Sequence, residues 1–383
     1  MADLSPMMKQ YLEIKQQHKD EILFYRIGDF YEMFYDDAIT ASRELDLTLT
    51  GKQCGQKERA PMCGVPFHSY ETYMARLIAK GYKVAICEQT EDPALAKGLV
   101  KREIVRVVTP GTVIESSMLQ DDRNNYIASL YLKGDGAGLC FADVSTGTAH
   151  VTELKNPKIG MAVIAELCRY RPSEVLFNPG TLSCREVTAY IKKHMNCAVE
   201  LMEDEKYAPG LIDTTLAGQF GRDWASTTEI GAEGLVRYAM GGLLQYLHDT
   251  QIKGVSRLKT VIRYTEAQYM HLSTVTRANL ELTETMRGRE KRGTLLWVLD
   301  KTSTAMGKRL LRSWLEQPLV SSEIVNHRLN AVECLVKQTV ARGELAETLR
   351  YITDIERLMT RTIYGSATPK EIYTMAQTFD RLP

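Results

Sequence analysis

The first part of the chain alternates short apolar runs with segments of helical periodicity. Apolar residues continue through EILFYRIG (21–28) and stop at a glycine, which predicts a buried strand. A Ser-Pro pair at 5–6 precedes apolar positions spaced as on a helix, so a helix is predicted to begin there. Similar segments alternate as far as EIVRVVTPGTV (103–113). Residues 1–113 are therefore predicted to form a mixed α/β domain.

A second pattern follows the polar, turn-rich segment 114–125, which is predicted to be a linker. This part contains three strand-like runs, YIASLYL, GLCFADVS and TAHVTEL, separated by KGDGA and TG as in successive hairpins. A helical stretch at 159–170, the strand-like EVLF and further helix and strand segments come next. Three antiparallel strands that lead into α/β units predict a ribonuclease-H-like α/β domain over residues 126–250.

Helical periodicity takes over from about residue 270, and strand-like patterns disappear. Residues 251–383 are therefore predicted to belong to an all-α domain. The sequence ends just after another helical stretch, so we interpret this part as the beginning of a larger helical domain. One stripe of apolar positions consists of Val325, Leu329, Val332 and Val336.

Composition limits the kinds of partner that the chain as a whole could attract. Its 48 basic and 48 acidic residues give no net charge, so any binding of nucleic acid has to come from local patches. An apolar run long enough to span a membrane is absent from the sequence, and the N-terminal residues do not resemble a secretion signal. Eight cysteines without a C-x-x-C pair are typical of reduced thiols, so we expect a cytoplasmic protein.

The segment RIGDFYEMFYDDA (26–38) places a carboxylate, Glu32, among aromatic residues. On a helix that began in the low 30s, Phe30 and Glu32 would lie about 200° apart and could not act together. If the helix begins only after Glu32, residues 30–32 are extended. Phe30 and Glu32 then share one side and Tyr31 takes the other. An aromatic ring beside a carboxylate can stack on a base and hydrogen-bond its edge, whereas the alternative is that Phe30 is one more core aromatic.

Other candidate sites have weaker patterns. Asp143 lies where a ribonuclease-H nuclease carries its first metal-binding carboxylate, but two-metal chemistry needs several convergent acids and no clear partner follows. Cys54 and Cys63 are too far apart for a zinc knuckle, and the seven histidines form no H-x-x-x-H pair. The phosphate-binding pattern G-x-x-x-x-G-K-S/T does not occur, and MGKR (306–309) lacks its spacing. The sequence thus predicts no catalytic residues and no metal site.

Several long motifs, in order along the chain, resemble the bacterial MutS family of mismatch-repair proteins. The resemblance to its mismatch-recognition domain rests on GDFYEMFYDDA, LDLTLTGK, APMCGVPFHSYETYMARLIAKGYKVAICEQTEDP and KREIVRVVTPGT. GLCFADVSTGTAHVTEL resembles its connector domain. The core, or lever, domain is represented by TRANLELTET, GTLLWVLDKTSTAMGKRLLRSWLEQPL and DIERLMTRTIYGSATP. Together these motifs cover essentially the whole chain.

The resemblance assigns roles to two residues of the first motif. In the family, the aromatic residue of G-x-F-Y-E wedges beside a mispaired base and the Glu two positions later hydrogen-bonds that base. These roles carry over to Phe30 and Glu32, which are both present. Contacts with the DNA backbone are expected from nearby cations, although a solvated charged face is an equal alternative for each. These candidates are Arg26, Lys52, Lys97, Lys101, Arg102 and Arg106.

The resemblance also implies partners and cofactors. The DNA partner would be a duplex with mismatches or small loops, and the protein would be cytoplasmic and associated with the nucleoid. The family's ATPase domain, with its ATP and Mg²⁺ and main dimer contact, is expected beyond residue 383. We therefore expect no cofactor in this chain and a homodimer that is weak or absent. A MutL-type partner would bind through the connector domain.

Two alternatives to mismatch binding are considered. The first is a metal-dependent nuclease that uses the ribonuclease-H-like middle domain. The second is a MutS relative devoted to recombination. Such relatives typically lack the sensor domain or its Phe-x-Glu pair, and the intact pair of Phe30 and Glu32 argues against this second alternative.

Overall fold

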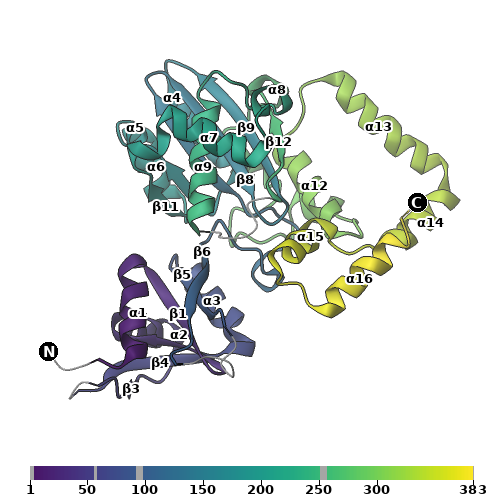
Figure 1. Ribbon diagram of the computed structural model, residues 1–383. Coiled ribbons are helices and arrows are strands. Elements are labelled where there is room, and N and C mark those ends of the chain that lie inside the picture. The colour runs from purple at the N-terminus through teal and green to yellow at the C-terminus, as the bar shows by residue number, and fades with distance from the viewer. Residues whose placement is uncertain (1–3, 56–57, 92–97, 251–256, 383) are drawn as a thin grey trace. The chain divides into compact units, whose positions relative to one another are not determined.

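The computed structural model describes residues 4–55, 58–91, 98–250 and 257–382. These residues form two compact units, and the labels of their helices and strands are those of Figure 1. The first unit contains residues 1–118 with 245–255, and the second contains residues 119–244 with 256–383.

A six-stranded mixed sheet forms the centre of the first unit, in the order β3-β4-β2-β1-β5-β6. β1 and β5 are parallel, and the other neighbouring pairs are antiparallel. The predicted strand at 21–28 is confirmed by β1. The strands are β1 (Glu21–Ile27), β2 (Phe30–Phe34), β3 (Thr50–Lys52), β4 (Ala60–Pro66), β5 (Lys83–Gln89) and β6 (Arg102–Val108).

Helices cover both faces of this sheet. On one face, α1 (Pro6–Gln17) buries Tyr11, whose ring meets those of Tyr25 and Phe34 edge-on at centroid distances of 5.4 and 5.0 Å. α2 (Tyr35–Leu45) and α3 (Tyr70–Ala79) pack on the other face, where the rings of Tyr31 and Tyr70 are 5.1 Å apart. α1 begins at the proline that the sequence indicated, and the prediction of a mixed α/β domain is confirmed.

The second unit contains another six-stranded mixed sheet, in the order β11-β10-β7-β8-β9-β12. β7, β8 and β9 pair as two successive antiparallel hairpins, as predicted, and β10 pairs parallel to both β7 and β11. β12 pairs parallel to β9. The strands are β7 (Ile127–Lys133), β8 (Gly136–Asp143), β9 (Thr148–Lys155), β10 (Glu174–Phe177), β11 (Ala198–Leu201) and β12 (Thr260–Arg263).

The helices next to this sheet include α4 (Ile159–Tyr170), which coincides with the predicted helix at 159–170. Tyr170 at its end stacks on Phe141 of β8 with a centroid distance of 4.1 Å, and Leu167 joins the same core. The others are α5 (Pro179–Leu182), α6 (Arg185–His194), α7 (Pro209–Phe220), α8 (Trp224–Thr227) and α9 (Val236–Thr250).

Strand β12 lies within the range 251–383 that the sequence assigned to an all-α region, so that prediction is wrong for residues 260–263. β12 has only four residues, too few to show a strand period, and its pairing with β9 determines its conformation. The helices that follow it are α10 (Thr274–Leu280), α11 (Leu295–Leu299), α12 (Ala305–Glu316), α13 (Ser322–Lys337), α14 (Thr339–Leu349), α15 (Ile355–Tyr364) and α16 (Pro369–Phe379).

Side-chain caps explain where several of these helices begin. The side chain of Thr304 accepts a hydrogen bond at the start of α12, and Thr368 forms a capping box with Glu371 at the start of α16. In Figure 1, α13 stands away from the sheet. Its apolar stripe is exposed, with Leu329 at 57% and Val332 at 55%, so in the described structure this stripe is not part of a core.

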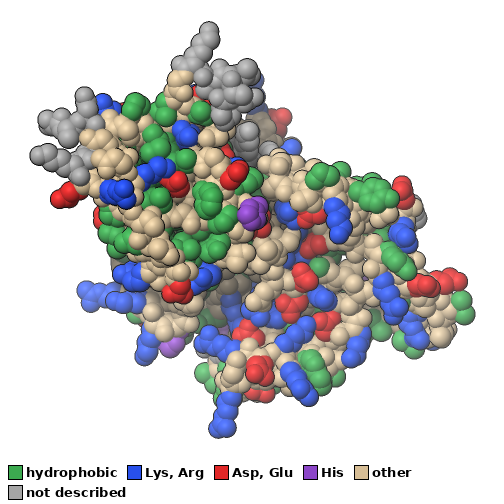
Figure 2. All heavy atoms as spheres, turned by 90° about the horizontal axis from the view of Figure 1, so that it is seen from below, with side chains coloured by type: hydrophobic (Ala, Val, Ile, Leu, Met, Phe, Trp, Pro, Cys, Tyr) green, Lys and Arg blue, Asp and Glu red, His purple; other side chains and the backbone are tan. Residues whose placement is uncertain are grey.

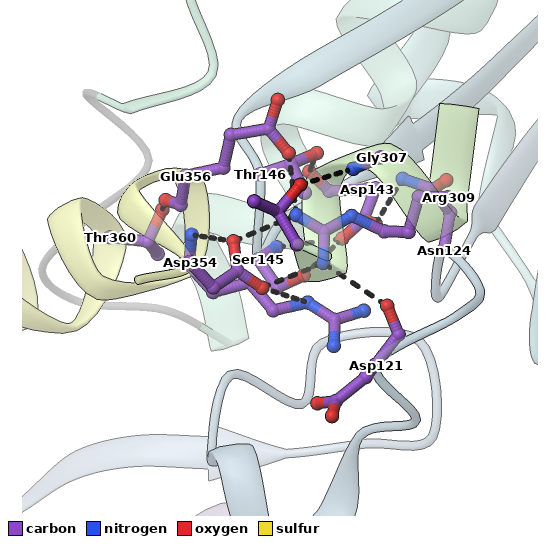
Figure 3. A network of polar contacts seen from close by, with 12 residues as sticks. Asp121, Asn124, Asp143, Ser145, Thr146, Gly307, Arg309, Asp354, Glu356 and Thr360 are labelled. Carbon is purple, nitrogen blue, oxygen red and sulfur yellow. Dashed lines mark hydrogen bonds and ion pairs between the residues drawn. The ribbon is translucent and has the colours of Figure 1, made fainter. Parts of the chain in front are cut away.

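Buried arginines fasten α12 and α15 to the segment that the sequence indicated as a linker (Figure 3). Arg309 forms two hydrogen bonds with the Asp354 carboxylate, of 2.6 and 2.8 Å. Arg357 donates to the backbone carbonyls of residues 120 and 123, at 2.8 and 2.7 Å. Arg312 donates to the carbonyl of residue 122 at 3.0 Å. Residues 120–123 are therefore held in place by the helical part of the second unit.

Candidate nucleic-acid interface

Phe30 is the first residue of β2 and directly follows the turn that joins β1 to β2. Ile27 and Phe30 are register partners across this turn, and Gly28 supplies the positive φ of 56° that it requires. The Phe67 amide donates to the carbonyl of Asp29 at 2.8 Å and ties the turn to the end of β4. The Phe30 side chain is 47% exposed. A large apolar ring is thus held in solvent at the end of a well-anchored hairpin.

The backbone is extended through Glu32, and α2 begins only at Tyr35. Phe30 and Glu32 consequently lie on the same side of β2, whereas Tyr31 points to the opposite side and is 1% exposed. The extended alternative is therefore confirmed, and Phe30 is not a core aromatic. Phe34, the last residue of β2, is buried.

Glu32 is held on the sheet surface by an ion pair. Its Oε2 lies 2.5 Å from Nζ of Lys52, which is the last residue of β3. The Glu32 side chain is only 15% exposed, so its carboxylate has lost much of its contact with water. The structure thus brings together three residues that the sequence named, Phe30, Glu32 and Lys52.

Arg26 supports the hairpin from the other face of the sheet. Its guanidinium lies 3.4 Å from the ring centroid of Phe67, and its Nε donates to the Gly28 carbonyl at 2.5 Å. Phe67 is 40% exposed and directly follows Pro66, the register partner of Phe30 on β4. The sequence pattern did not identify Phe67 as a site residue. Exposed aromatic rings therefore flank the hairpin on both faces of the sheet, with Phe30 of β2 on one face and Phe67, which follows β4, on the other.

Tyr31 fixes the buried side of the same strand. Its hydroxyl hydrogen-bonds to the carboxylate of Glu88 on β5. Burial raises the pKa of Tyr31 well above its ordinary value, and the nearby Glu88 carboxylate raises it further. Tyr31 therefore remains a neutral hydrogen-bond donor that anchors β2 on one face of the sheet, and Phe30 and Glu32 lie on the opposite face.

Two of the six cations proposed for backbone contact, Arg102 and Arg106, are buried. Arg102 donates to the carbonyl of Arg26 at 2.7 Å and lies over the Tyr25 ring. Arg106 forms a 2.6 Å ion pair with Glu115. Both guanidinium groups are engaged inside the domain, so the structure gives no support for direct contact of either with a DNA backbone.

The remaining cations differ in their surroundings. Lys101 is exposed and lies 2.6 Å from the Glu103 carboxylate. Lys97 lies outside the described residues. On the face of the molecule shown in Figure 2, basic and acidic side chains are interspersed. Local groups such as the pair on β2 and β3 therefore matter more than bulk charge, as the zero net charge indicates.

Asp143, on which a nuclease would depend, is 1% exposed and already has hydrogen-bond partners (Figure 3). Its carboxylate accepts from Asn124 Nδ2 at 2.8 Å and from Ser145 Oγ at 2.6 Å. Within the described ranges, no group of three or more His, Cys, Asp or Glu side chains is placed to hold a metal ion. Asp143 fastens the end of β8 to neighbouring segments, and the nuclease alternative has no support.

Two further expectations from the sequence concern phosphate binding and cysteines. Residues 306–309 lie in the first turns of α12, and the Gly307 amide donates to the side chain of Thr304 at 3.0 Å, so this segment is not the glycine-rich loop that cradles the phosphates of ATP. Cys54 and Cys63 are free and buried, and burial raises the pKa of the Cys63 thiol to about 11. In the described parts of the chain, no helix is both long and apolar enough to cross a membrane.

Comparison with known proteins accounts for nearly the whole chain. Three family models match in order: MutS domain I at residues 5–117, MutS domain II at residues 125–259 and MutS domain III at residues 275–383.

Curated relatives named DNA mismatch repair protein MutS match along the full chain. The protein from Lachnoclostridium phytofermentans is 46% identical over 388 residues, which cover 100% of this chain and 41% of the relative. The protein from Ruminiclostridium cellulolyticum is 46% identical over 383 residues, with 100% and 44% covered. The one from Clostridioides difficile is 42% identical over 386 residues, with 100% and 40% covered. The chain thus spans about two fifths of the length of these relatives, and it belongs to the MutS family.

Proposed function

We propose that this chain binds mismatched or unpaired bases in duplex DNA and so starts mismatch repair. The observation that carries the proposal is the half-exposed ring of Phe30 beside Glu32 on one extended strand. A ring that extends from a rigid sheet can enter a base step, whereas a ring on a mobile loop would lose more entropy on binding. The matches to MutS domain I and to MutS proteins along the full chain support this reading.

Selectivity would come from the ease with which DNA deforms. A wedge that enters from the minor groove costs a few kcal/mol of unstacking. A mispair is already poorly stacked, so this cost is smaller there than at a Watson–Crick pair. One aromatic ring can therefore serve many different mismatches without reading a pattern of base edges. Phe30 would have this role.

Glu32 would add a hydrogen bond at the mispair. A carboxylate is repelled by phosphates, so it helps only where it accepts a hydrogen bond from a base or becomes protonated and donates one. At a matched pair the base edges are occupied, and the repulsion remains without compensation. Glu32 would thus oppose binding to matched duplex more than binding to a mispair.

We propose the following organisation for the rest of the chain. Residues 1–113 form the mismatch-recognition domain, 114–125 a linker and 126–250 a ribonuclease-H-like connector, whose sheet β12 (Thr260–Arg263) also joins. The rest of 251–383 is the first part of the lever domain. The hairpins and flanking parallel strands of the second sheet support the connector assignment. This part of the protein would itself be non-catalytic and need no cofactor, and the connector would meet a MutL-type partner. Dimerisation would depend mainly on the family's ATPase domain.

Binding of the unmodified chain to paired duplexes tests the proposal. Fluorescence anisotropy at one fixed salt concentration should give a lower Kd for a G·T duplex than for the matched duplex of otherwise identical sequence. Equal affinity for the two would refute mismatch recognition by this chain. The same samples with Mg²⁺ or Mn²⁺ should remain uncut. Metal-dependent cleavage that Asp143→Asn abolishes would instead establish a nuclease.

A further inference from the structure

Lys52 reaches Glu32 across an intervening strand. In the sheet order β3-β4-β2, Lys52 is on β3 and Glu32 is on β2, so β4 lies between them. The register pairs Lys52 with Ala60 and Glu32 with Gly64, which puts all four positions on the same side of the sheet. The ammonium group nevertheless lies 2.5 Å from the carboxylate. This contact requires the Lys52 side chain to extend over β4 toward β2.

Gly64 makes room for Glu32 on that surface. A Cβ atom at this position would lie 3.2 Å from the carbonyl oxygen of Tyr31 and 3.6 Å from Cγ of Glu32. A side chain at position 64 would therefore be tight against the Tyr31 carbonyl and would occupy the surface next to Glu32, the residue directly opposite. Glycine leaves the surface beside Glu32 open, and the Lys52 side chain can approach the carboxylate there.

The ion pair is sheltered compared with ordinary surface pairs. The side chains of Lys52 and Glu32 are 29% and 15% exposed. The Lys52 ammonium also lies 5.7 Å from the ring centroid of Phe34, a buried residue on the same side of β2. The ring and the carboxylate together favour one position of the ammonium. A partly desolvated pair of opposite charges interacts more strongly than an exposed pair, because water screens it less.

We propose that Lys52 is a positioning residue for Glu32 and not a contact of the DNA backbone. Its ammonium orients the carboxylate beside Phe30 and offsets the charge that Glu32 carries toward the phosphates. Glu32 can then approach the edge of a mispaired base in a defined direction. This inference rests on the proposed function, because it concerns how Glu32 discriminates between duplexes.

A backbone contact by Lys52 and positioning of Glu32 by Lys52 would affect different properties of DNA binding. A backbone contact adds the same free energy to every duplex, so its loss weakens matched and mismatched binding equally. A positioning residue affects only what Glu32 does, so its loss changes the ratio of the two Kd values. The ratio for matched over G·T duplex therefore separates the roles.

A double-mutant cycle measures this ratio. It uses the unmodified chain, Lys52→Met, Glu32→Gln and the double variant, with anisotropy at several salt concentrations. We expect Lys52→Met to lower the ratio at least threefold when Glu32 is present and to lower it no further in the Glu32→Gln background. Lys52→Arg should keep most of the ratio, because it retains the charge and a donor. Lys80→Met is the matched control, since Lys80 forms a 2.8 Å ion pair with Glu44 away from β2.

Several outcomes would overturn the proposal. If Lys52→Met weakens both duplexes alike and reduces the salt slope by about one phosphate contact, Lys52 touches the backbone. If the ratio falls equally in both backgrounds, Lys52 acts independently of Glu32. A lower thermal midpoint with an unchanged ratio would show a role in stability alone. If the unmodified chain itself has a ratio of one, the proposed function fails together with this inference, and that result is recognised before any variant is compared.

Discussion

Phe30→Ala is expected to remove the preference for mismatched duplex while it leaves the fold intact. The side chain is 47% exposed at the start of β2, so truncation leaves no closed cavity. The other side of the strand keeps its anchors, since Tyr31 remains buried and hydrogen-bonded to Glu88. Binding should therefore lose the interaction of the ring with the base step, and the protein should lose little else.

The structure sets the scale of the cost in stability. Truncation of a fully buried Phe to Ala costs roughly 3–5 kcal/mol, part of which is the cavity that remains. Half of the Phe30 surface is already in water and no cavity is left behind, so Phe30→Ala should lower the free energy of unfolding by only about 1 kcal/mol. Phe34 offers a matched comparison, because it lies on the same side of the same strand and is 1% exposed. Phe34→Ala should cost the full amount.

Stacking of an aromatic ring on a base contributes about 1–3 kcal/mol. Loss of the Phe30 ring should therefore raise the Kd for a G·T duplex by a factor of about 5 to 150. The Kd for matched duplex should change much less, because the wedge is disfavoured there. Chemical denaturation gives the free energy of unfolding, and anisotropy with the paired duplexes gives the two Kd values.

Two results would refute this reasoning. A loss of stability as large as that of Phe34→Ala would show that Phe30 belongs to the core. An unchanged ratio of Kd values in a stable variant would show that the ring does not enter the DNA. Ile39→Ala, at a position of α2 that is 46% exposed, controls for the removal of any exposed apolar side chain.

Four further expectations concern DNA affinity, the pH dependence of stability, ATP binding and the oligomeric state. Glu32→Gln should strengthen binding to matched DNA by on the order of 1 kcal/mol and binding to mismatched DNA by no more than that, so discrimination between the duplexes falls. Anisotropy measures both affinities. Weaker binding to both duplexes would mean that Glu32 holds the local fold. His150 lies near Tyr126 and Tyr170, and burial lowers its pKa to about 4. The unfolded chain therefore takes up the proton first, and the free energy of unfolding should fall by up to roughly 3 kcal/mol as pH drops from about 6.5 to 4. Denaturation curves of His150→Gln should lack this component, and an unchanged pH dependence would contradict the assignment. Calorimetric titration with ATP and Mg²⁺ should show no saturable site, because the sequence lacks the phosphate-binding pattern G-x-x-x-x-G-K-S/T. Sedimentation should show mainly monomer, because dimerisation is proposed to depend mainly on the family's ATPase domain. A saturable site, or a stable dimer at micromolar concentration, would contradict these two expectations.

Apolar runs and helical spacing of apolar residues predicted much of the fold. The helix at 159–170 was predictable from its apolar spacing, and the hairpins of β7, β8 and β9 from apolar runs separated by turn residues; β8 is buried along its whole length. β12 was not predictable, since its four residues take their conformation from pairing with β9. The apolar stripe of α13 predicted a helix but could not show that this face is exposed in the described structure.

The candidate site was predictable in part. Side chains alternate along an extended backbone, so an extended segment 30–32 places Phe30 and Glu32 on one side. The sequence could not show whether this segment is extended, because that depends on where α2 begins. Burial of Arg102, the first residue of β6, could not be predicted, because the sequence does not show whether a cation at the start of a strand faces solvent or the interior. The contact of Lys52 with Glu32 depends on a strand order that the spacing of the two residues does not indicate.

Unstacking at the mispair is the most direct test of a Phe30 wedge. A duplex with 2-aminopurine next to a G·T pair reports unstacking, because the fluorescence of this base is quenched when it is stacked. Saturating amounts of the unmodified chain should raise the fluorescence with the G·T duplex but not with the matched duplex, and Phe30→Ala should abolish the rise. Preferential binding of the G·T duplex without any change in fluorescence, or an equal rise with Phe30→Ala, would show that Phe30 does not open the base step.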